Sequence, residues 1–211
     1  MSAAAGIVLP GLMAGEGKMS FEAQYGLAAL SEILLLGIPA LIFLTDLCKE
    51  SGALRTAFPK QDPNRVGLAM LAAVGFTIVG MVVTVLWLTL LSLISFSPLQ
   101  PVLKNPETLM QLLLAILMAA VVPAACEEML FRGVLLRFAY RKWGEKAAVW
   151  GTAAVFAVMH FSVAGFPMLL MIGVLLARLA IKGKGLTLPF VFHAMYNLSA
   201  VVINRYALRR G

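Results

Sequence analysis

Charged side chains are scarce in this sequence. Asp, Glu, Lys and Arg make up only 13% of the 211 residues, whereas 61% are hydrophobic, and the mean hydropathy is +0.93. In an ordinary soluble domain about a quarter of the residues are charged and about half are apolar. The composition therefore excludes such a domain and indicates an integral membrane protein with several helices.

Cysteines, nucleic-acid-binding patterns and repeats are also lacking. The two cysteines, Cys48 and Cys126, are too few for the disulfide framework of a short secreted chain, so both are predicted to be free thiols. The net charge is +7, yet no basic patch interleaved with aromatic residues is present, and no nucleic-acid partner is expected. No internal repeat is visible, which argues against a transporter built from two inverted halves.

What the sequence does contain is a series of long apolar runs. A transmembrane helix needs about 20 mostly apolar residues. We therefore predict an all-α fold: a polytopic transmembrane helical bundle of about six spans, with a range of six to eight. The lipid bilayer is then a partner of this multi-pass protein, which would lie in the cytoplasmic membrane of a bacterial host. The predicted spans are 26–45, 66–95, 108–139 (with a kink at Pro123), 147–164, 166–181 and 187–204.

The distribution of basic residues predicts the orientation. Lysine and arginine are concentrated in the connections 46–65, 137–146 and 182–186, which the positive-inside rule places on the cytoplasmic side. A basic tail at the end of the chain would fall on the opposite side in a six-span arrangement, so the span count stays open. The predicted organisation is a lead-in at 1–25, N-terminal transmembrane helices at 26–107, a second group of helices at 108–204 and the tail at 205–211.

Few ionisable residues lie inside the predicted spans. A charged side chain at the bilayer centre costs at least about 2.5–3.5 kcal/mol on insertion scales, so such residues are functional candidates by default. Glu32, near one end of its predicted span, is interpreted as structural or interfacial, and Arg178 as reaching toward the membrane surface. Both histidines of the chain belong to this set, which consists of Glu32, Glu127, Glu128, Arg132, His160, Arg178 and His193.

Helical spacing suggests how these side chains meet. Glu128 and Arg132 are four residues apart and can pair on one helix face, while Glu127 is rotated by about 100° from Glu128. If the helices converge, a buried glutamate can take a proton from a water molecule, and imidazole and amide N–H groups can stabilise an oxyanion. This is the chemistry of peptide hydrolysis. If three helices converge, four side chains would surround one small polar cavity that could hold this water: Glu127, His160, His193 and Asn197.

Three short motifs in this region carry a family resemblance. The segments "EEMLFR" at 127–132, "FAVMH" at 156–160 and "HAMYN" at 193–197 resemble, in order, the EExxxR, FxxxH and HxxxN motifs of the CPBP family. This is the CAAX-protease and bacteriocin-processing (Abi) family of intramembrane proteases. The resemblance covers roughly residues 108–204. It implies an intramembrane endopeptidase that hydrolyses a peptide bond of a membrane-associated or lipidated peptide or protein.

The resemblance also implies a role for each motif residue. Glu127 would activate the water together with His160, and His193 and Asn197 would form the oxyanion hole. Glu128 completes the catalytic set. The supporting residues implied are Arg132, which pairs with Glu128, and Phe156.

Several alternatives stay open at the level of sequence. A zinc site needs three protein ligands plus water, and Glu127, His160 and His193 could supply them, although no HExxH pair is present. Some describe the family as metalloproteases, whereas its eukaryotic CAAX-processing members resemble glutamate proteases without bound zinc; we expect a metal-independent water. A non-catalytic immunity or scaffold protein that binds a peptide is an alternative function, as is a small transporter or proton relay.

Overall fold

The computed structural model describes residues 19–49, 57–96 and 103–207, and all regular elements within these ranges are helical, which confirms the predicted all-α class. Segments labelled η are π-helical turns, which are wider than α-helical ones. In chain order the elements are α1 (Phe21–Glu32), η2 (Ile33–Gly37), α2 (Ile38–Lys49), α4 (Pro63–Leu93), α5 (Leu109–Ile116), η3 (Leu117–Val121), α6 (Val122–Glu128), η4 (Met129–Leu135), α7 (Leu136–Met159), α8 (Phe166–Lys182) and α9 (Thr187–Ala207).

The π-helical turns join successive α-helices into long continuous helical rods. Element α1 runs through η2 into α2, and α5 runs through η3, α6 and η4 into α7. Pro123 lies in the first turn of α6, directly after η3. Proline removes a backbone donor, and its ring clashes with the carbonyl of the preceding turn. A π-helical turn, which is wider than an α-helical one, precedes it. The kink predicted at Pro123 stays a prediction.

The first rod begins earlier than predicted. Ser20 caps α1 by accepting a hydrogen bond from the Ala23 amide, so the helix starts at Phe21 instead of residue 26. Residues 1–18 of the predicted lead-in lie outside the described residues.

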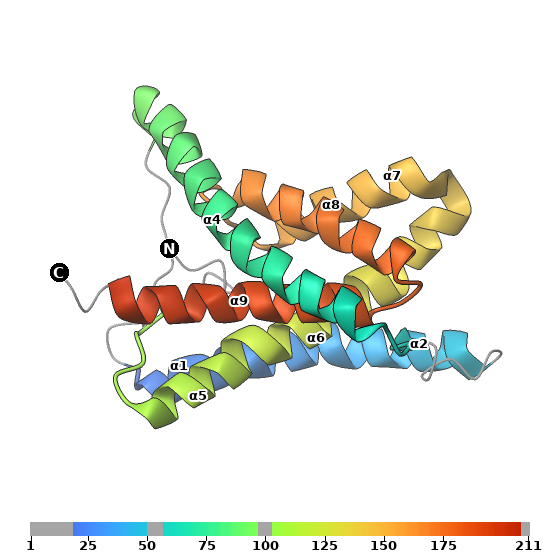
Figure 1. Cartoon of the computed structure of the whole chain (residues 1–211), viewed down its shortest axis with the longest axis horizontal. Helices are drawn as coiled ribbons and strands as arrows, with labels where there is room; N and C mark the ends of the chain where they lie inside the picture. Colours follow the sequence, from blue (N-terminus) through green and yellow to red (C-terminus); the bar gives the residue numbers. More distant parts are fainter. Residues whose placement is uncertain (1–18, 50–56, 97–102, 208–211) are drawn as a thin grey trace.

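A single residue reverses the chain between the two halves of α7. Gly144 has φ 77° and ψ 174°, a backbone conformation that glycine adopts without steric cost. Figure 1 shows the chain turning back at this bend. The predicted span 108–139 therefore comes before the bend in the chain, and the predicted span 147–164 comes after it. The expected loop at 137–146 is wrong in length, because helix continues on both sides of the bend.

Three helical stretches in the described ranges are long and apolar enough to cross a membrane: Phe21–Thr45, Pro63–Leu93 and Leu109–Met159. Together with the apolar composition, these three stretches indicate that the chain is an integral membrane protein. The third stretch contains two of the predicted spans, because it includes the Gly144 bend. Helix α8 has only 17 residues, short of the about 20 that a span needs. The count of six spans stays a prediction.

The connections between helices gather at two ends of the bundle. At one end, the Leu186 amide donates to the Ala57 carbonyl at 2.7 Å and the Thr187 hydroxyl to the Pro59 carbonyl at 2.8 Å. The end of α2, the Gly144 bend and the α8–α9 connection all lie at this end, on the right in Figure 1. The described parts of the basic connections thus share one end of the bundle. Their cytoplasmic orientation stays a prediction.

Arg205 lies at the opposite end of the bundle. Its guanidinium donates to the Thr108 carbonyl at 2.9 Å, and the start of α1 and the end of α9 lie together on the left in Figure 1. This position departs from the positive-inside pattern. The hydrogen bond to a backbone carbonyl gives the charge a local partner there.

Helices α7 and α8 pack closely through a glycine. A Cβ atom added at Gly173 of α8 would lie 3.0 Å from both Cα and Cβ of Ala153 on α7. Small residues at such crossings let two helix backbones approach. The aromatic and aliphatic side chains that form the main core beside this crossing include Phe131, Phe156, Ile172, Leu176 and Phe192.

Gly173→Val is therefore expected to destabilise the bundle. Overpacking at a tight contact typically costs about 1–3 kcal/mol, which would lower the midpoint of thermal unfolding in detergent. Gly151→Val on α7 is the matched control, because an added Cβ at Gly151 would meet no atom within 4 Å beyond the neighbouring backbone of its own helix. Equal unfolding midpoints for the two variants would contradict the tight α7–α8 crossing.

Candidate active site

The two adjacent glutamates end helix α6 in the protein interior. Glu127 is 1% exposed and Glu128 is 0% exposed. Nη1 of Arg132, one turn further along in η4, donates to Oε1 of Glu128 at 2.9 Å. Nη2 of Arg132 donates to the carbonyl of Gly173 on α8 at 3.2 Å. The Arg132 charge therefore compensates that of Glu128 inside the bundle.

His193 from α9 reaches the same carboxylate. Its Nδ1 lies 2.8 Å from Oε1 of Glu128, and because a carboxylate oxygen only accepts, Nδ1–H is the donor. The contact fixes the ring so that its other nitrogen, Nε2, lies 3.9 Å from Oε2 of Glu127. His193 thus joins the two neighbouring glutamates from another helix.

His160, at the end of α7, is held by the backbone of its own helix. Its Nδ1 lies 2.7 Å from the carbonyl oxygen of Phe156, which can only accept, so Nδ1–H is again the donor. Nε2 of His160 lies 3.7 Å from Oε2 of Glu127. When each imidazole is neutral, its Nε2 presents a lone pair toward Glu127.

The ring of Phe156 lies among the polar groups of the site. It is 0% exposed, its centroid lies 4.5 Å from the His160 ring and 5.9 Å from the His193 ring, and the Arg132 guanidinium sits over it at 4.6 Å. A cation over an aromatic face is attracted by the ring quadrupole. Phe156 therefore packs against both imidazoles and the arginine, besides accepting the His160 hydrogen bond.

Two imidazole rings, those of His160 and His193, approach the carboxylate of Glu127. The separations of 3.7 and 3.9 Å from Oε2 to the two Nε2 atoms exceed hydrogen-bond length and suit a bridging water. Within the described part of the chain, Oε2 of Glu127 is buried and has no hydrogen-bond partner. A buried acceptor of this kind is rare and calls for an explanation such as a bound water or a catalytic role.

Asn197 is the one predicted catalytic residue outside this set of contacts. It lies one turn after His193 on α9 and is 3% exposed. Its side chain takes no part in the hydrogen bonds described above. The structure therefore brings together Glu127, Glu128, Arg132, Phe156, His160 and His193, and it places Asn197 on the neighbouring turn.

The metal-binding alternative finds no support in the geometry. Across residues 19–49, 57–96 and 103–207, no group of three His, Cys, Asp or Glu side chains is arranged to hold a metal ion. No step proposed below involves a metal. Cys126 is a buried free thiol, as predicted, while the side chain of Cys48 lies outside the described residues.

Glu32 is the site neighbour whose position the sequence did not reveal. Glu32, interpreted from the sequence as structural or interfacial, is only 2% exposed. The first helix starts at Phe21 and continues through η2 into α2, so Glu32 lies well inside a long rod and not near its end. The only feature of the sequence that pointed to the burial of Glu32 was the presence of a charged residue within an apolar run.

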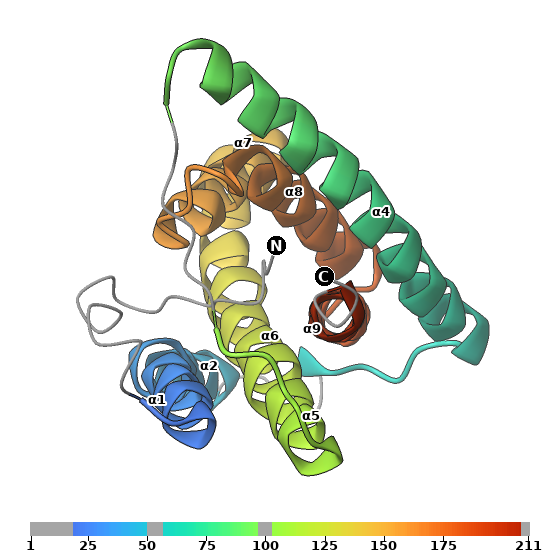
Figure 2. The same ribbon diagram turned by 90° about the vertical axis from the view of Figure 1, so that its left-hand side faces the viewer.

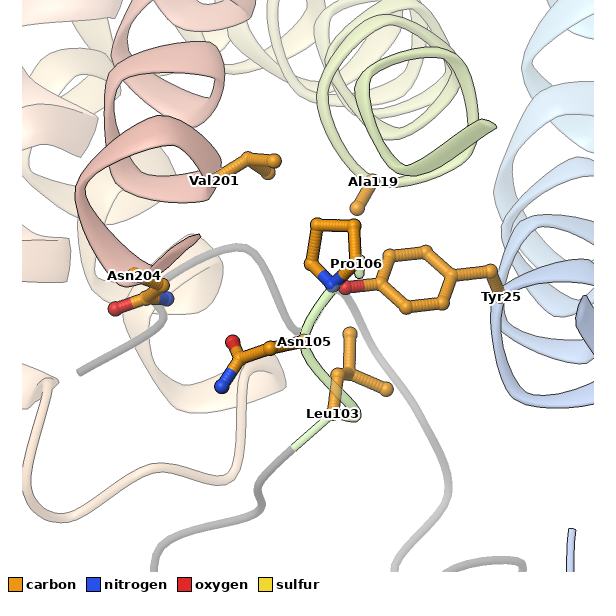
Figure 3. A pocket seen from close by; sticks show the side chains of 7 residues that line it. All are labelled: Tyr25, Leu103, Asn105, Pro106, Ala119, Val201 and Asn204. Atoms are coloured by element: carbon orange, nitrogen blue, oxygen red, sulfur yellow. The ribbon is translucent and has the colours of Figure 1, made fainter. Parts of the chain in front are cut away.

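A separate small pocket lies away from the glutamates, near the start of α1 and the end of α9 (Figure 3). It has room for about one water molecule. None of the predicted catalytic residues lines it; the lining residues are Tyr25, Leu103, Asn105, Pro106, Ala119, Val201 and Asn204.

Comparison with known proteins supplies the family. Residues 109–199 match the model of the family described as "Type II CAAX prenyl endopeptidase Rce1-like". The segment is Rce1-like. This confirms the family resemblance of the three motifs and implies a protease, that is, a hydrolase. The Rce1-like segment contains all the predicted site residues, and α1, α2 and α4 lie outside it. No curated protein and no solved structure matches the chain.

Proposed function

We propose that this protein is an intramembrane endopeptidase that hydrolyses a peptide bond of a membrane-associated or lipidated peptide. The observation that carries the proposal is the surroundings of Oε2 of Glu127. This buried oxygen has no hydrogen-bond partner among the described residues and faces Nε2 of His160 and of His193. A water molecule placed there contacts a base and an imidazole at once.

The first step is attack by this water. Glu127, as the carboxylate, takes one proton from the water, while Nε2 of His160 accepts a hydrogen bond from the second O–H. The hydrogen bond from His160 to the Phe156 carbonyl keeps that lone pair directed at the water. The resulting hydroxide adds to the carbonyl carbon of the scissile peptide bond.

The second step places negative charge on the carbonyl oxygen of the substrate. His193 and Asn197 are the proposed donors to this oxyanion. His193 donates from Nε2 when it carries protons on both nitrogens, because Nδ1–H is already bonded to Glu128. Glu128 therefore acts as a positioning residue for His193, and Arg132 holds Glu128 in turn.

Collapse of the intermediate completes the reaction. The proton taken by Glu127 passes to the leaving nitrogen, the C–N bond breaks, and Glu127 returns to its carboxylate form. One water is consumed for each peptide bond. The products are a new carboxylate and a new amine.

Cleavage by the purified protein in lipid vesicles tests the proposal. We expect hydrolysis of a farnesylated CAAX-type peptide, or of the same peptide anchored by an apolar segment, but not of the free unanchored peptide. Mass spectrometry of the products identifies the cut bond. A parallel comparison of membrane-associated peptides in cells with the wild type and with Glu127→Ala identifies native substrates.

Binding without cleavage would contradict the proposal. If both anchored peptides bind the vesicle-embedded wild type and remain intact, the protein acts as a peptide-binding scaffold. Vesicles that take up the peptide without cutting it would instead indicate transport.

A further inference from the structure

The half of α7 that leads to the Gly144 bend has an outward face made of basic and aromatic side chains. Arg137 and Arg141 lie four residues apart and share one side of the helix. Phe138 and Lys142 each follow one of these arginines and share the adjoining side. Phe138 is 59% exposed, and Arg141 and Lys142 are exposed as well. Cations and an aromatic ring therefore lie together on one surface.

The opposite face of this half-helix is packed into the protein. Leu136 and Ala139 are buried in one cluster. The same cluster contains Ala177 and Ala180 of α8, and Figure 2 shows α8 running beside α7. These contacts fix the rotation of the helix about its own axis. The basic and aromatic side chains of the other face are therefore directed away from the bundle.

The tip of the bend carries two exposed aromatic rings with a cation beside them. The rings of Phe138 and Trp143 meet edge to face, with their centroids 6.0 Å apart. Nζ of Lys142 lies 5.8 Å from the centroid of the first ring and 5.0 Å from that of the second. Trp143 is 58% exposed. Because tryptophan is enriched at the level of the lipid headgroups in membrane proteins, this pair of rings is typical of a contact with lipid.

The charge of the bend indicates a negatively charged partner. Residues 137–146 contain four basic residues and one acidic residue, Glu145. In the described part of the chain none of these four basic side chains forms an ion pair with a carboxylate. Lys182 and Lys184 are exposed in the neighbouring α8–α9 connection, at the same end of the bundle. Lysine and arginine near a membrane surface attract anionic lipids, which matches this excess of positive charge.

We propose that the Gly144 bend is a binding site for the headgroups of anionic phospholipids. Arg141 and Lys142 donate hydrogen bonds to the phosphate oxygens, as guanidinium and ammonium groups do in other phosphate sites. The rings of Phe138 and Trp143 lie against the glycerol and the upper part of the acyl chains. In an integral membrane protein such headgroups surround the ends of the spanning helices. None of the proposed catalytic residues belongs to this site, so the inference does not rest on the proposed function.

Quenching of tryptophan fluorescence by brominated lipids tests this site. In Trp87→Phe/Trp150→Phe, Trp143 is the only tryptophan, and bromine on an acyl chain quenches a tryptophan that the lipid contacts. The protein is placed in zwitterionic vesicles that contain a small fraction of brominated phosphatidylglycerol or, separately, of brominated phosphatidylcholine. The attraction of one lysine or arginine to an anionic lipid corresponds to about a fivefold preference. Quenching should therefore show phosphatidylglycerol enriched at Trp143 by about fivefold or more.

Arg141→Gln/Lys142→Gln in the same background should lower this enrichment by about fivefold or more. The matched control is Lys60→Gln/Arg65→Gln, which removes the same charge from exposed positions near the start of α4, at the same end of the bundle. It should keep the enrichment. Equal quenching by the two brominated lipids would overturn the proposal, as would an equal loss of enrichment in both double variants. Quenching by acrylamide in the water but by neither lipid would indicate a soluble partner instead.

Thermal unfolding of the wild-type protein is a second measurement that needs no tryptophan replacement. Phosphatidylglycerol added to the protein in a zwitterionic detergent should raise the unfolding midpoint more than phosphatidylcholine does, because a ligand that binds only the folded state stabilises it. Arg141→Gln/Lys142→Gln should abolish this difference. Equal midpoints with the two lipids for the wild type would contradict the proposal. If inorganic phosphate alone produced the same rise, the site would bind the free ion and the lipid proposal would fail.

Discussion

Glu127→Gln is expected to reduce peptide hydrolysis by about 10²–10⁴-fold, the usual effect of removing a general base. The amide keeps the volume of the carboxyl group but cannot take the proton from water. Because Oε2 of Glu127 makes no hydrogen bond in the described part of the structure, its replacement breaks no such contact of that oxygen. The variant should therefore keep the thermal unfolding midpoint and the peptide affinity of the wild type.

The measurement compares initial cleavage rates, unfolding midpoints and peptide binding in the same vesicles. Glu145→Gln is the matched control, because Glu145 is exposed beside the Gly144 bend and remote in sequence from the three motifs. It should cleave at the wild-type rate. Full proteolysis by Glu127→Gln would remove the base from the mechanism and leave peptide binding as the function to explain.

Arg132→Ala is expected to act on stability. The change removes the 2.9 Å ion pair with Glu128, the hydrogen bond to the Gly173 carbonyl and the contact with the Phe156 ring. Glu128 then remains buried without its compensating cation. Removing one partner of a buried pair typically costs about 3–5 kcal/mol, so the unfolding midpoint and the yield of folded protein should fall together with activity.

Arg141→Ala is the control for this prediction, since Arg141 is exposed on α7. Unfolding in detergent, followed by circular dichroism, should show wild-type behaviour for the control and a lower midpoint for Arg132→Ala. The two site variants are thus expected to differ in kind: one folded and inactive, the other poorly folded. A wild-type midpoint for Arg132→Ala would show that Glu128 does not depend on this cation.

Contacts within one helix were predictable from the sequence. The spacing of Glu128 and Arg132 predicts their pairing, and the ion pair is present, because residues four apart on a helix lie on the same face. Apolar runs likewise indicated where most helices lie. A helix period gives no such information about the neighbouring helix, so the hydrogen bond from His193 to Glu128 was not predicted.

The deviations from the predictions have separate physical causes. The π-helical turns carry no clear sequence signal, and the single-residue bend at Gly144 was expected to be a loop because its surroundings are basic. The depth of Glu32 was not predicted because the start of α1 depends on a cap at Ser20, which shifts the residue from near a helix end to deep inside a rod. Its burial depends on helices that pack from elsewhere in the chain.

The bend at Gly144 also separates the two halves of the site in the order of synthesis. Both glutamates and the arginine precede it, and both histidines follow it. A ribosome therefore completes the acidic half first. Glu127 can meet His160 once α7 has been made, whereas His193 reaches both glutamates only once α9 has been made. The growing chain therefore lacks part of the proposed site until α9 has been made.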